Sequence, residues 1–350
     1  MQAPDSIRLT TLSSASGCGC KIAPKTLEAI LVHQQNIPHL ESLIVGNDTR
    51  DDAAVISISD KQALIATTDF FTPIVDDPFD WGYISAANAL SDVYAMGGKP
   101  LIALAILGWP ADLPPELAAQ VLNGGRAACA TAGIPIAGGH SIHTKEPFFG
   151  LTVNGLVPPL AVKKNHSANP GDCIFMTKPL GTGILTAAAK RNQVSQNHLM
   201  LAIEWMKKIN YEGETLGALD YISAMTDITG FGFLGHLHEM CGSKLKACIQ
   251  GRDIPLMEAA IGYADQFIFP DNTWRNWQAY AADTNLSDET LMPWICDPQT
   301  NGGLLFTIDP QKENALISFW NSLQSDKVLV KVGYMQTQTS NIRVEIANDL

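Results

Sequence analysis

The chain has 350 residues, and at roughly 100 to 200 residues per domain this length predicts two domains. Its 35 acidic and 23 basic residues give a formal net charge of -12, which argues against nucleic acid or an anionic membrane surface as the main partner. An anionic substrate such as a nucleotide would therefore need metal ions or a local basic cluster.

The cysteines and the N-terminus bear on where the protein works. The seven cysteines are too sparse for a secreted disulfide scaffold, and no Cys-x-x-Cys pair indicates a structural zinc site. The chain does not start with a basic region followed by an apolar run, and no stretch approaches the roughly 18 apolar residues of a membrane span. We therefore expect a soluble protein of the reducing cytoplasm that does not use a membrane.

The first stretch with chemical potential is Ser-Gly-Cys-Gly-Cys-Lys at residues 16–21. Glycines on both sides of Cys18 let the backbone approach a ligand closely and move as a flap. The ammonium of Lys21 favours a nearby thiolate and can also bind phosphate. The alternative is that Cys18 simply packs, since free cysteines are among the most buried residues.

An aspartate-rich loop, Gly-Asn-Asp-Thr-Arg-Asp-Asp at residues 46–52, offers carboxylates for a metal. Side chains alternate along an extended chain, so Asp51 and Asp52 should point to opposite sides, and only one of them can ligate a given ion. We expect a helix at 24–33, a strand at 53–58 and a strand at 63–69 that ends in Asp69.

Residues 79–96 predict an alanine-rich helix. At 100° per residue Ser85, Asn88 and Asp92 fall on one narrow face. A solvated polar stripe is the ordinary explanation of such a face. The alternative is that its carboxylate faces a neighbouring element.

The rest of the first half predicts a strand at 101–107, a helix at 115–132, and strands at 134–137 and 148–157. Gly138-Gly139-His140-Ser141 follows the third of these elements. A Gly-Gly pair after a strand can cradle phosphate with backbone amides, but it is usually only a turn. Pro158-Pro159 then makes a reasonable domain boundary.

The second half predicts strands at 173–177, 222–227, 244–249, 304–308, 328–332 and 342–346, with helices at 184–190, 197–208, 215–219, 229–240 and 310–323. Asp227 ends a strand and can either cap the following helix or bind a metal. His236 and His238 do not share a helical face, so they are poor joint metal ligands.

Taken together, motifs spread over the chain resemble the selenophosphate synthetase family. They lie in order at residues 17–21, 46–55, 67–71, 88–100, 137–141, 225–232 and 296–300. The wider aminoimidazole ribonucleotide synthetase-like superfamily shares the Asp-Asp loop and the Met-Gly-Gly region. The Cys-Gly-Cys-Lys and Gly-Gly-His-Ser motifs are what point to the selenium family.

The resemblance implies a two-domain α/β (α+β) fold. Residues 1–157 would form the N-terminal ATP-binding and dimerisation domain, with a mobile glycine-rich loop at 11–21, and residues 158–350 a C-terminal α/β domain. The N-terminal domain would pair with its twin in a homodimer to form a β-barrel. ATP would bind at sites shared between the subunits, with Mg²⁺ held by aspartates.

The resemblance also assigns site residues. It implies catalytic roles for Cys18 and Lys21, and metal ligation by Asp52, Asp92 and Asp227, which replaces the capping interpretation of Asp227. The implied nucleotide contacts are Lys21, Thr49, Arg50, Asp51, Asp69, Asp92, Gly139, His140 and Ser141. One departure from the family pattern is Asn301, which stands before Gly302-Gly303 where serine is expected.

The implied reaction is ATP + selenide + water giving selenophosphate + AMP + phosphate, which supplies activated selenium for selenocysteine and selenouridine. One alternative is another ATP-dependent enzyme of the superfamily, such as the ribonucleotide synthetase or the hydrogenase-maturation dehydratase; the latter needs a C-terminal cysteine, and this chain ends in Leu350. The other alternative is a non-catalytic selenium carrier that uses Cys18 and Cys20, but a carrier has no use for three dispersed metal aspartates.

Overall fold

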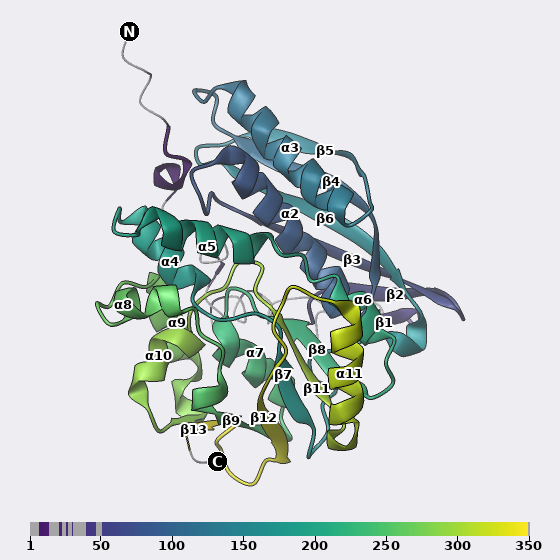
Figure 1. Cartoon of the computed structure of the whole chain (residues 1–350). Helices are drawn as coiled ribbons and strands as arrows, with labels where there is room; N and C mark the ends of the chain where they lie inside the picture. Colours follow the sequence, from purple (N-terminus) through teal and green to yellow (C-terminus); the bar gives the residue numbers. More distant parts are fainter. Residues whose placement is uncertain are drawn as a thin grey trace.

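The computed structural model describes residues 7–13, 21–22, 26, 30, 40–46 and 51–348. The described residues form two β-sheets, one from each half of the chain, and each sheet carries helices (Figure 1). The first is a 6-stranded sheet of order β1-β2-β3-β6-β4-β5. Its strands are β1 (Leu43–Val45), β2 (Ala54–Ser59), β3 (Gln62–Phe71), β4 (Lys99–Trp109), β5 (Ile136–His143) and β6 (Phe148–Val157).

Two helices, α2 (Pro78–Ala95) and α3 (Pro115–Thr131), pack side by side on one face of this sheet (Figure 1). α2 begins as its sequence predicts, because Pro78 suits the first helical position and the Asp77 carboxylate accepts a hydrogen bond from the Asp80 amide at 2.8 Å. The helices approach closely at two glycines. A Cβ atom on Gly82 would lie 1.9 Å from the Val121 carbonyl oxygen, and one on Gly124 would lie 1.9 Å from the Phe79 carbonyl oxygen.

We expect Gly124→Ala to destabilise the protein by about 2 kcal/mol or more, because backbone cannot yield to a new methyl group in a packed interface. The gain in helix propensity, about 1 kcal/mol, does not offset this clash. Gly262→Ala is the matched control, since a Cβ atom there meets nothing within 4 Å. Thermal unfolding of both variants checks the prediction, and an unchanged melting temperature for Gly124→Ala would contradict the close helix packing.

Within the described part of a single chain, the opposite face of the first sheet is exposed to solvent. Apolar side chains stand on it, with Leu101 53% exposed and Ile142 51% exposed. The edge strand β5 is exposed along all but its first residue. An uncovered apolar face beside an unpaired edge strand is a surface that proteins ordinarily cover.

The expectation of a turn at Gly138–Ser141 is wrong. These residues continue β5, which pairs in parallel with β4 and places Gly139 opposite Ala105. Glycine is needed there because a Cβ atom on Gly139 would lie 2.2 Å from the Ala105 carbonyl oxygen. The Gly-Gly pair therefore permits close strand pairing and does not end the strand.

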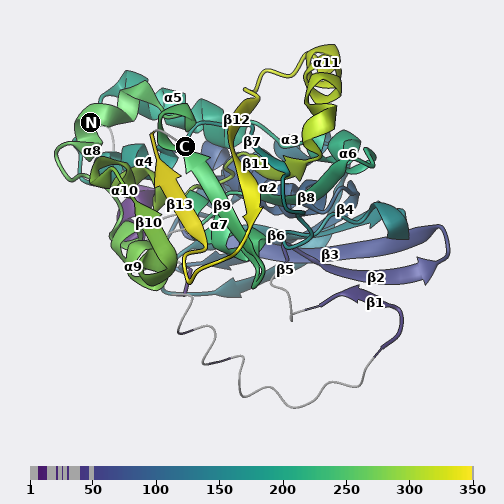
Figure 2. The same cartoon turned by 90° about the horizontal axis from the view of Figure 1, so that it is seen from below.

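The second half forms a 7-stranded sheet of order β10-β13-β9-β12-β7-β11-β8. Its strands are β7 (Cys173–Met176), β8 (Ile222–Asp227), β9 (Leu245–Gln250), β10 (Thr284–Leu286), β11 (Leu304–Ile308), β12 (Val330–Thr337) and β13 (Val344–Ala347). Seen from below, β13, β9 and β12 lie side by side, and β2 and β3 of the first sheet extend away to the right (Figure 2).

Helices cover both faces of the second sheet. α7 (Gly232–Cys241) packs on one face with a core that includes Phe233, and α11 (Glu313–Leu323) packs on the other with a core that includes Trp320. The remaining helices of this half are α4 (Thr182–Lys190), α5 (Gln196–Lys207), α6 (Glu212–Gly217), α8 (Ile261–Ala264), α9 (Asp271–Tyr280) and α10 (Met292–Ile295). Among the residues described, no helix has the length and apolar character to cross a membrane.

Most predicted elements are confirmed to within a few residues, and the differences have simple reasons. The strands β1 and β10 were not predicted, because three residues are too few for an alternating pattern to stand out. The helix predicted at 215–219 is α6, which begins at Glu212, and the strand predicted at 328–332 is β12, which begins at Val330. The helix predicted at 24–33 lies outside the described residues except at positions 26 and 30.

α2 connects the two halves. It packs on β3 and β6 of the first sheet and also contacts β8, α5 and α6 of the second half. Every residue from Ile84 to Ala95 in this helix is buried, which explains why small residues fill it. The solvated stripe considered for Ser85, Asn88 and Asp92 is therefore wrong, since all three side chains are buried.

Candidate active site

Three aspartates from distant parts of the chain gather where the two halves meet. Asp52 lies before β2, Asp92 lies on α2, and Asp227 ends β8. The Thr226 hydroxyl donates to Oδ1 of Asp52 at 2.9 Å, so the C-terminal half holds a carboxylate of the N-terminal half. Oδ2 of Asp92 accepts from the Thr67 hydroxyl of β3 at 2.6 Å.

Burial and mutual repulsion shape the electrostatics of this trio. Burial, followed by the charges of Asp227 and Asp92, raises the pKa of Asp52 well above its ordinary value. Burial and the charge of Asp227 likewise raise the pKa of Asp92. The pKa of Asp227 is also raised by burial, against a hydrogen bond from Ser91 that lowers it. Three carboxylates that repel one another are a costly arrangement without a cation.

The trio has free coordinating capacity. Oδ2 of Asp52 and Oδ2 of Asp227 are buried and have no hydrogen-bond partner among the described residues. Buried acceptors without donors are rare, and hard carboxylate oxygens are the ligands that Mg²⁺ prefers. These orphan oxygens fit a divalent cation.

The described residues do not form a closed metal cage, however. In the part of the chain that the structure describes, no three His, Cys, Asp or Glu side chains are already arranged around one ion. Mg²⁺ is commonly bound by one or two carboxylates, with water and phosphate oxygens completing its shell. These carboxylates therefore suit an ion that binds together with a phosphate ligand, whose oxygens would complete its coordination shell.

Asp69 and Lys21 meet next to the trio. Nζ of Lys21 lies 3.6 Å from Oδ2 of Asp69, and the same oxygen accepts a hydrogen bond from Nδ2 of Asn88 at 2.8 Å. Asn88 lies on α2 one turn before Asp92, so one helix face serves both carboxylates. The sequence placed Asn88 and Asp92 on one face, and the structure turns that face toward β3.

Asp51 and Asp52 have different partners, in agreement with the alternation argument. Oδ1 of Asp51 accepts from the Asn165 amide at 2.8 Å and lies 3.6 Å from Nδ1 of His166, and its side chain is fully buried. Asp51 therefore fixes the Asp-Asp loop to the segment that enters the C-terminal half. Its predicted nucleotide contact stays a prediction.

Gly139, His140 and Ser141 lie apart from the aspartates in the same chain. Across the sheet Asp69 is opposite Leu151, Leu151 is opposite Ala105, and Ala105 is opposite Gly139. Three strand spacings of about 4.8 Å put Gly139 roughly 14 Å from Asp69. The two predicted groups of nucleotide contacts are therefore not brought together within one chain.

Four residues of interest from the sequence lie outside the described residues: Cys18, Cys20, Thr49 and Arg50. Their predicted roles stay predictions. The histidines behave as expected, because Nε2 of His236 accepts from the Thr229 amide at 3.1 Å and Nε2 of His238 contacts the Thr284 hydroxyl at 3.0 Å. They share no site.

Sequence reasoning missed the residues that orient the carboxylates. Thr226 directly precedes Asp227 in the sequence and Thr67 stands two residues before Asp69, and this closeness to site aspartates is the sequence feature that could have indicated both threonines.

Sequence reasoning also missed that the motif at 296–300 stabilises the start of a helix. Oδ2 of Asp297 accepts from the Gly183 amide at the start of α4 at 3.0 Å, and burial raises the pKa of Asp297 to about 8.

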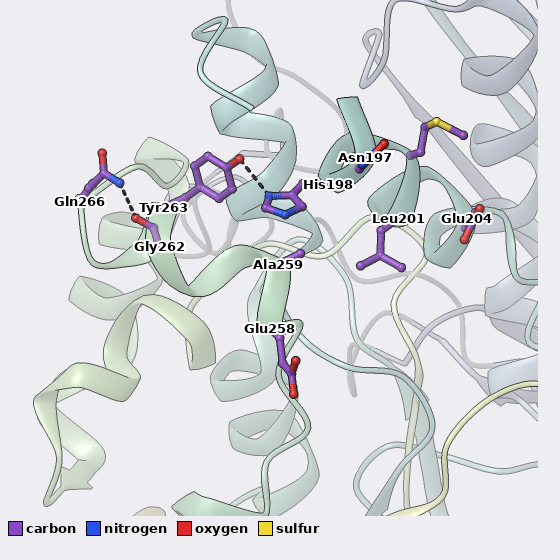
Figure 3. Close-up of a pocket in the computed structure, with 10 residues that line it drawn as sticks. Asn197, His198, Leu201, Glu204, Glu258, Ala259, Gly262, Tyr263 and Gln266 are labelled. Atoms are coloured by element: carbon purple, nitrogen blue, oxygen red, sulfur yellow. Dashed lines mark hydrogen bonds between the residues drawn. The ribbon is translucent and has the colours of Figure 1, made fainter. Parts of the chain in front are cut away.

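A cavity of about 890 Å³ lies between α5 and α8, away from these residues (Figure 3). His198 and Tyr263 point toward each other in it, with Nδ1 and the hydroxyl 3.0 Å apart. None of the predicted site residues lines this cavity. The aspartate trio, and not this cavity, is the candidate active site.

Comparisons with known families match both halves of the chain. AIR synthase related protein, N-terminal domain, matches residues 50–157, and AIR synthase related protein, C-terminal domain, matches residues 169–340. A protein of Aeromonas salmonicida (strain A449) named selenide, water dikinase is 47% identical over 345 residues, covering 97% of this chain and 99% of the relative. One of the same name from Enterobacter sp. (strain 638) is 50% identical over 313 residues, covering 88% and 89%.

Solved structures of other proteins share the fold. Thiamine-monophosphate kinase from Stenotrophomonas maltophilia K279a has a TM-score of 0.65 at 18% identity, covering 94% of this chain and 97% of that chain. The hydrogenase maturation protein HypE in complex with ATP has a TM-score of 0.61 at 17% identity, covering 95% and 90%. At such identities the likeness establishes the fold, which agrees with the two-domain α/β architecture expected from the sequence.

Proposed function

Because the chain belongs to the AIR synthase-related family and is nearly half identical to selenide, water dikinases over almost its whole length, we propose that it makes selenophosphate. The reaction is ATP + selenide + water giving selenophosphate + AMP + phosphate. The structural observation that carries the proposal is the buried trio Asp52, Asp92 and Asp227 with its orphan oxygens. An acidic protein can bind a triphosphate there only with cations.

Mg²⁺ would be held by Asp52, Asp92 and Asp227, and would offset the charge of the triphosphate and polarise the phosphoryl groups. The donor chemistry supports this assignment, since all three groups offer hard oxygens. ATP is the substrate, and Mg²⁺ is the cofactor.

Cations of the chain would act beside the metal. Lys21, already 3.6 Å from the Asp69 carboxylate, would turn to the phosphates once they bind, and Arg50 would join it. Both would stabilise negative charge that develops on the transferred phosphoryl group. The further proposed nucleotide contacts are Thr49, Asp51, Asp69, Asp92, Gly139, His140 and Ser141.

Selenide would attack the γ-phosphoryl group first, and water would then cleave the remaining ADP to AMP and phosphate. The glycine-rich stretch would close over the site, bring Cys18 close and exclude water during the first transfer. Water exclusion matters because hydrolysis of ATP competes with transfer to selenide. Cys18 and Lys21 are therefore the proposed catalytic residues.

We further propose that two chains form a homodimer through the open face of the first sheet, with ATP sites shared between them. The roughly 14 Å between Gly139 and Asp69 supports this, because in a single chain the motif at 137–141 makes no direct contact with the aspartates, whereas a partner chain could bring its own motif to them. The exposed edge strand and apolar face supply the surface.

The N-terminal domain that would form this dimer ends at residue 157, and the C-terminal α/β domain begins at 158.

Ile142→Asp is expected to convert the dimer to a monomer, since a carboxylate cannot be buried in an apolar interface. Light scattering should give twice the mass of the chain for the native protein and once the mass for the variant. Leu160→Asp is the control, because Leu160 is fully exposed and outside the sheet. A native protein that is monomeric at every concentration would contradict the shared site.

Removal of Mg²⁺ is expected to make stability depend on pH. The folded pKa values of Asp52 and Asp92 lie above the ordinary 3.8, so the native state keeps protons that the unfolded chain has released. The contribution of these two groups to the stability of the metal-free protein should therefore be greatest below about pH 4 and should fall as the pH rises through the raised pKa values, by up to roughly 1.4 kcal/mol per pH unit for each group.

Thermal unfolding in EDTA and in millimolar Mg²⁺ checks this expectation. Mg²⁺ should raise the melting temperature more at neutral pH than near pH 4, where the raised pKa values keep these carboxylates protonated and Mg²⁺ must displace the protons. An equal rise at both pH values would show that the carboxylates are already ionised without metal. In that case, repulsion within the trio would be weaker than the burial suggests.

Product analysis tests the proposed function. Chromatography of the nucleotides should show ATP converted to AMP, with selenide accelerating its consumption. Formation of ADP alone would favour a kinase-like relative, and selenium binding without any turnover would favour a carrier. The full-length match to selenide, water dikinases argues against both.

We place the reaction in the cytoplasm, in keeping with free thiols at Cys129, Cys173, Cys241, Cys248 and Cys296.

A further inference from the structure

Asn301, where the chain departs from its family pattern, lies in a turn just before β11 at the boundary between the two halves. Its φ is 48°, in the left-handed region that few residues other than glycine adopt and that asparagine tolerates. The residue is 1% exposed. A buried residue in such a conformation must be held by its surroundings.

The side-chain nitrogen and both backbone polar groups of Asn301 are hydrogen-bonded, whereas its Oδ1 is buried without a partner among the described residues. Nδ2 donates to the carbonyl oxygens of Met206 at 2.6 Å and Lys208 at 3.0 Å, at the end of α5. Its own carbonyl oxygen accepts from Nζ of Lys178 at 2.8 Å, and Lys178 is itself buried and also donates to Lys208. The turn is thereby fixed to the C-terminal half.

The backbone amide of Asn301 then fixes Asn88 in the N-terminal half. It donates to Oδ1 of Asn88 at 2.7 Å, and Nδ2 of Asn88 donates to Oδ2 of Asp69 at 2.8 Å. A backbone amide can only donate, so it determines which end of the Asn88 side chain carries oxygen. The donor end of Asn88 must therefore face Asp69.

A second contact reinforces the first. Nδ2 of Asn210 donates to the Gly302 carbonyl oxygen and to the Ser91 hydroxyl, both at 2.8 Å. Two consecutive residues of the turn are thus linked to α2, one directly and one through Asn210. Ser91 in turn hydrogen-bonds Asp227, so both connections end at a carboxylate of the candidate site.

We propose that Asn301 is a positioning residue for the nucleotide site, which orients the Asn88 amide so that Asp69 is held ready for the ligand. This inference rests on the proposed function, because it takes Asp69 to be a nucleotide contact. It adds a route by which the C-terminal half orders a carboxylate of the N-terminal half. Asn301 does not itself touch the substrate.

The test is equilibrium binding of a non-hydrolysable ATP analogue with Mg²⁺ by titration calorimetry. Asn301→Gly keeps the left-handed backbone and its amide but removes the side-chain bonds to Met206 and Lys208, so affinity should fall about tenfold. The KM for ATP should rise by a similar factor, with a smaller change in kcat. The serine hydroxyl of Asn301→Ser can replace one of the two donated hydrogen bonds. The affinity of this variant for the analogue should therefore lie between those of the native protein and Asn301→Gly.

Gln324→Gly is the matched control, since Gln324 has a φ of 50° at the exposed end of α11. It should leave analogue affinity unchanged. The route through Asn88 is tested by a double-mutant cycle, in which Asn88→Ala combined with Asn301→Gly should bind no more weakly than Asn88→Ala alone. A merely structural role for Asn301 would give additive losses and would overturn the proposal.

The remaining outcomes separate this inference from the proposed function. If the native protein does not bind the analogue, the nucleotide site itself fails, and the positioning role with it. If the native protein binds and Asn301→Gly binds with unchanged affinity, only the positioning role is overturned. Should Asn301→Gly fail to fold, Asn301→Ser supplies the same comparison.

Discussion

Asp227→Asn is expected to abolish selenophosphate formation and, at the same time, to raise the melting temperature of the metal-free protein at neutral pH. The first effect follows because the amide cannot replace a carboxylate as an anionic Mg²⁺ ligand, and we expect turnover to fall by at least about a thousandfold. The second follows because the change removes one of three mutually repelling buried charges.

The stability gain should be about 1 to 2 kcal/mol, the size expected when a strained functional charge is neutralised. Activity assays and thermal unfolding in EDTA measure the two effects separately. Asp60→Asn is the control, because Asp60 is an exposed carboxylate in the turn between β2 and β3 and should change neither quantity. A variant that is less stable than the native protein without metal would contradict the repulsion within the trio, whatever its activity.

Cys18→Ser is the second change with a large expected effect, and it should eliminate selenide-dependent formation of selenophosphate. The proposal assigns Cys18 to the selenium chemistry, and Lys21, three positions further along the sequence, lies 3.6 Å from the Asp69 carboxylate. A serine hydroxyl keeps the size of the thiol but is not ionised near neutral pH and is a poor partner for selenium.

Binding of the ATP analogue should survive this change, since no nucleotide contact is proposed for Cys18. Cys20→Ser is the matched control in the same stretch, and it should retain selenophosphate formation. Anaerobic turnover assays with selenide, run beside calorimetric binding, distinguish loss of chemistry from loss of the site. Full activity in Cys18→Ser would remove this residue from the mechanism.

Much of the fold could be predicted from sequence periodicity, and the exceptions are informative. The long strands and helices showed their patterns clearly, whereas β1 and β10 are too short to do so. The pair Gly138-Gly139 predicts a turn, because consecutive glycines usually mark one. What decided their structure was a close approach to β4, which is a contact between segments about 34 residues apart that no local pattern contains.

The candidate site could be predicted in part. Motif order supplied Asp52, Asp92 and Asp227, and the structure gathers these residues at one junction. Local sequence could not show that Thr226 holds Asp52, since they are 174 positions apart. The hydrogen bond from Asn301 to Asn88 joins residues 213 positions apart, which no local pattern can predict.

The measurement that tests the central claim most directly is anaerobic phosphorus NMR of the purified protein with ATP, Mg²⁺ and selenide. The account predicts that a selenophosphate resonance, AMP and phosphate grow together in equal amounts, and that the selenophosphate resonance is absent when selenide is omitted. ADP as the end product, or consumption of ATP without a selenophosphate resonance, would contradict the proposed reaction.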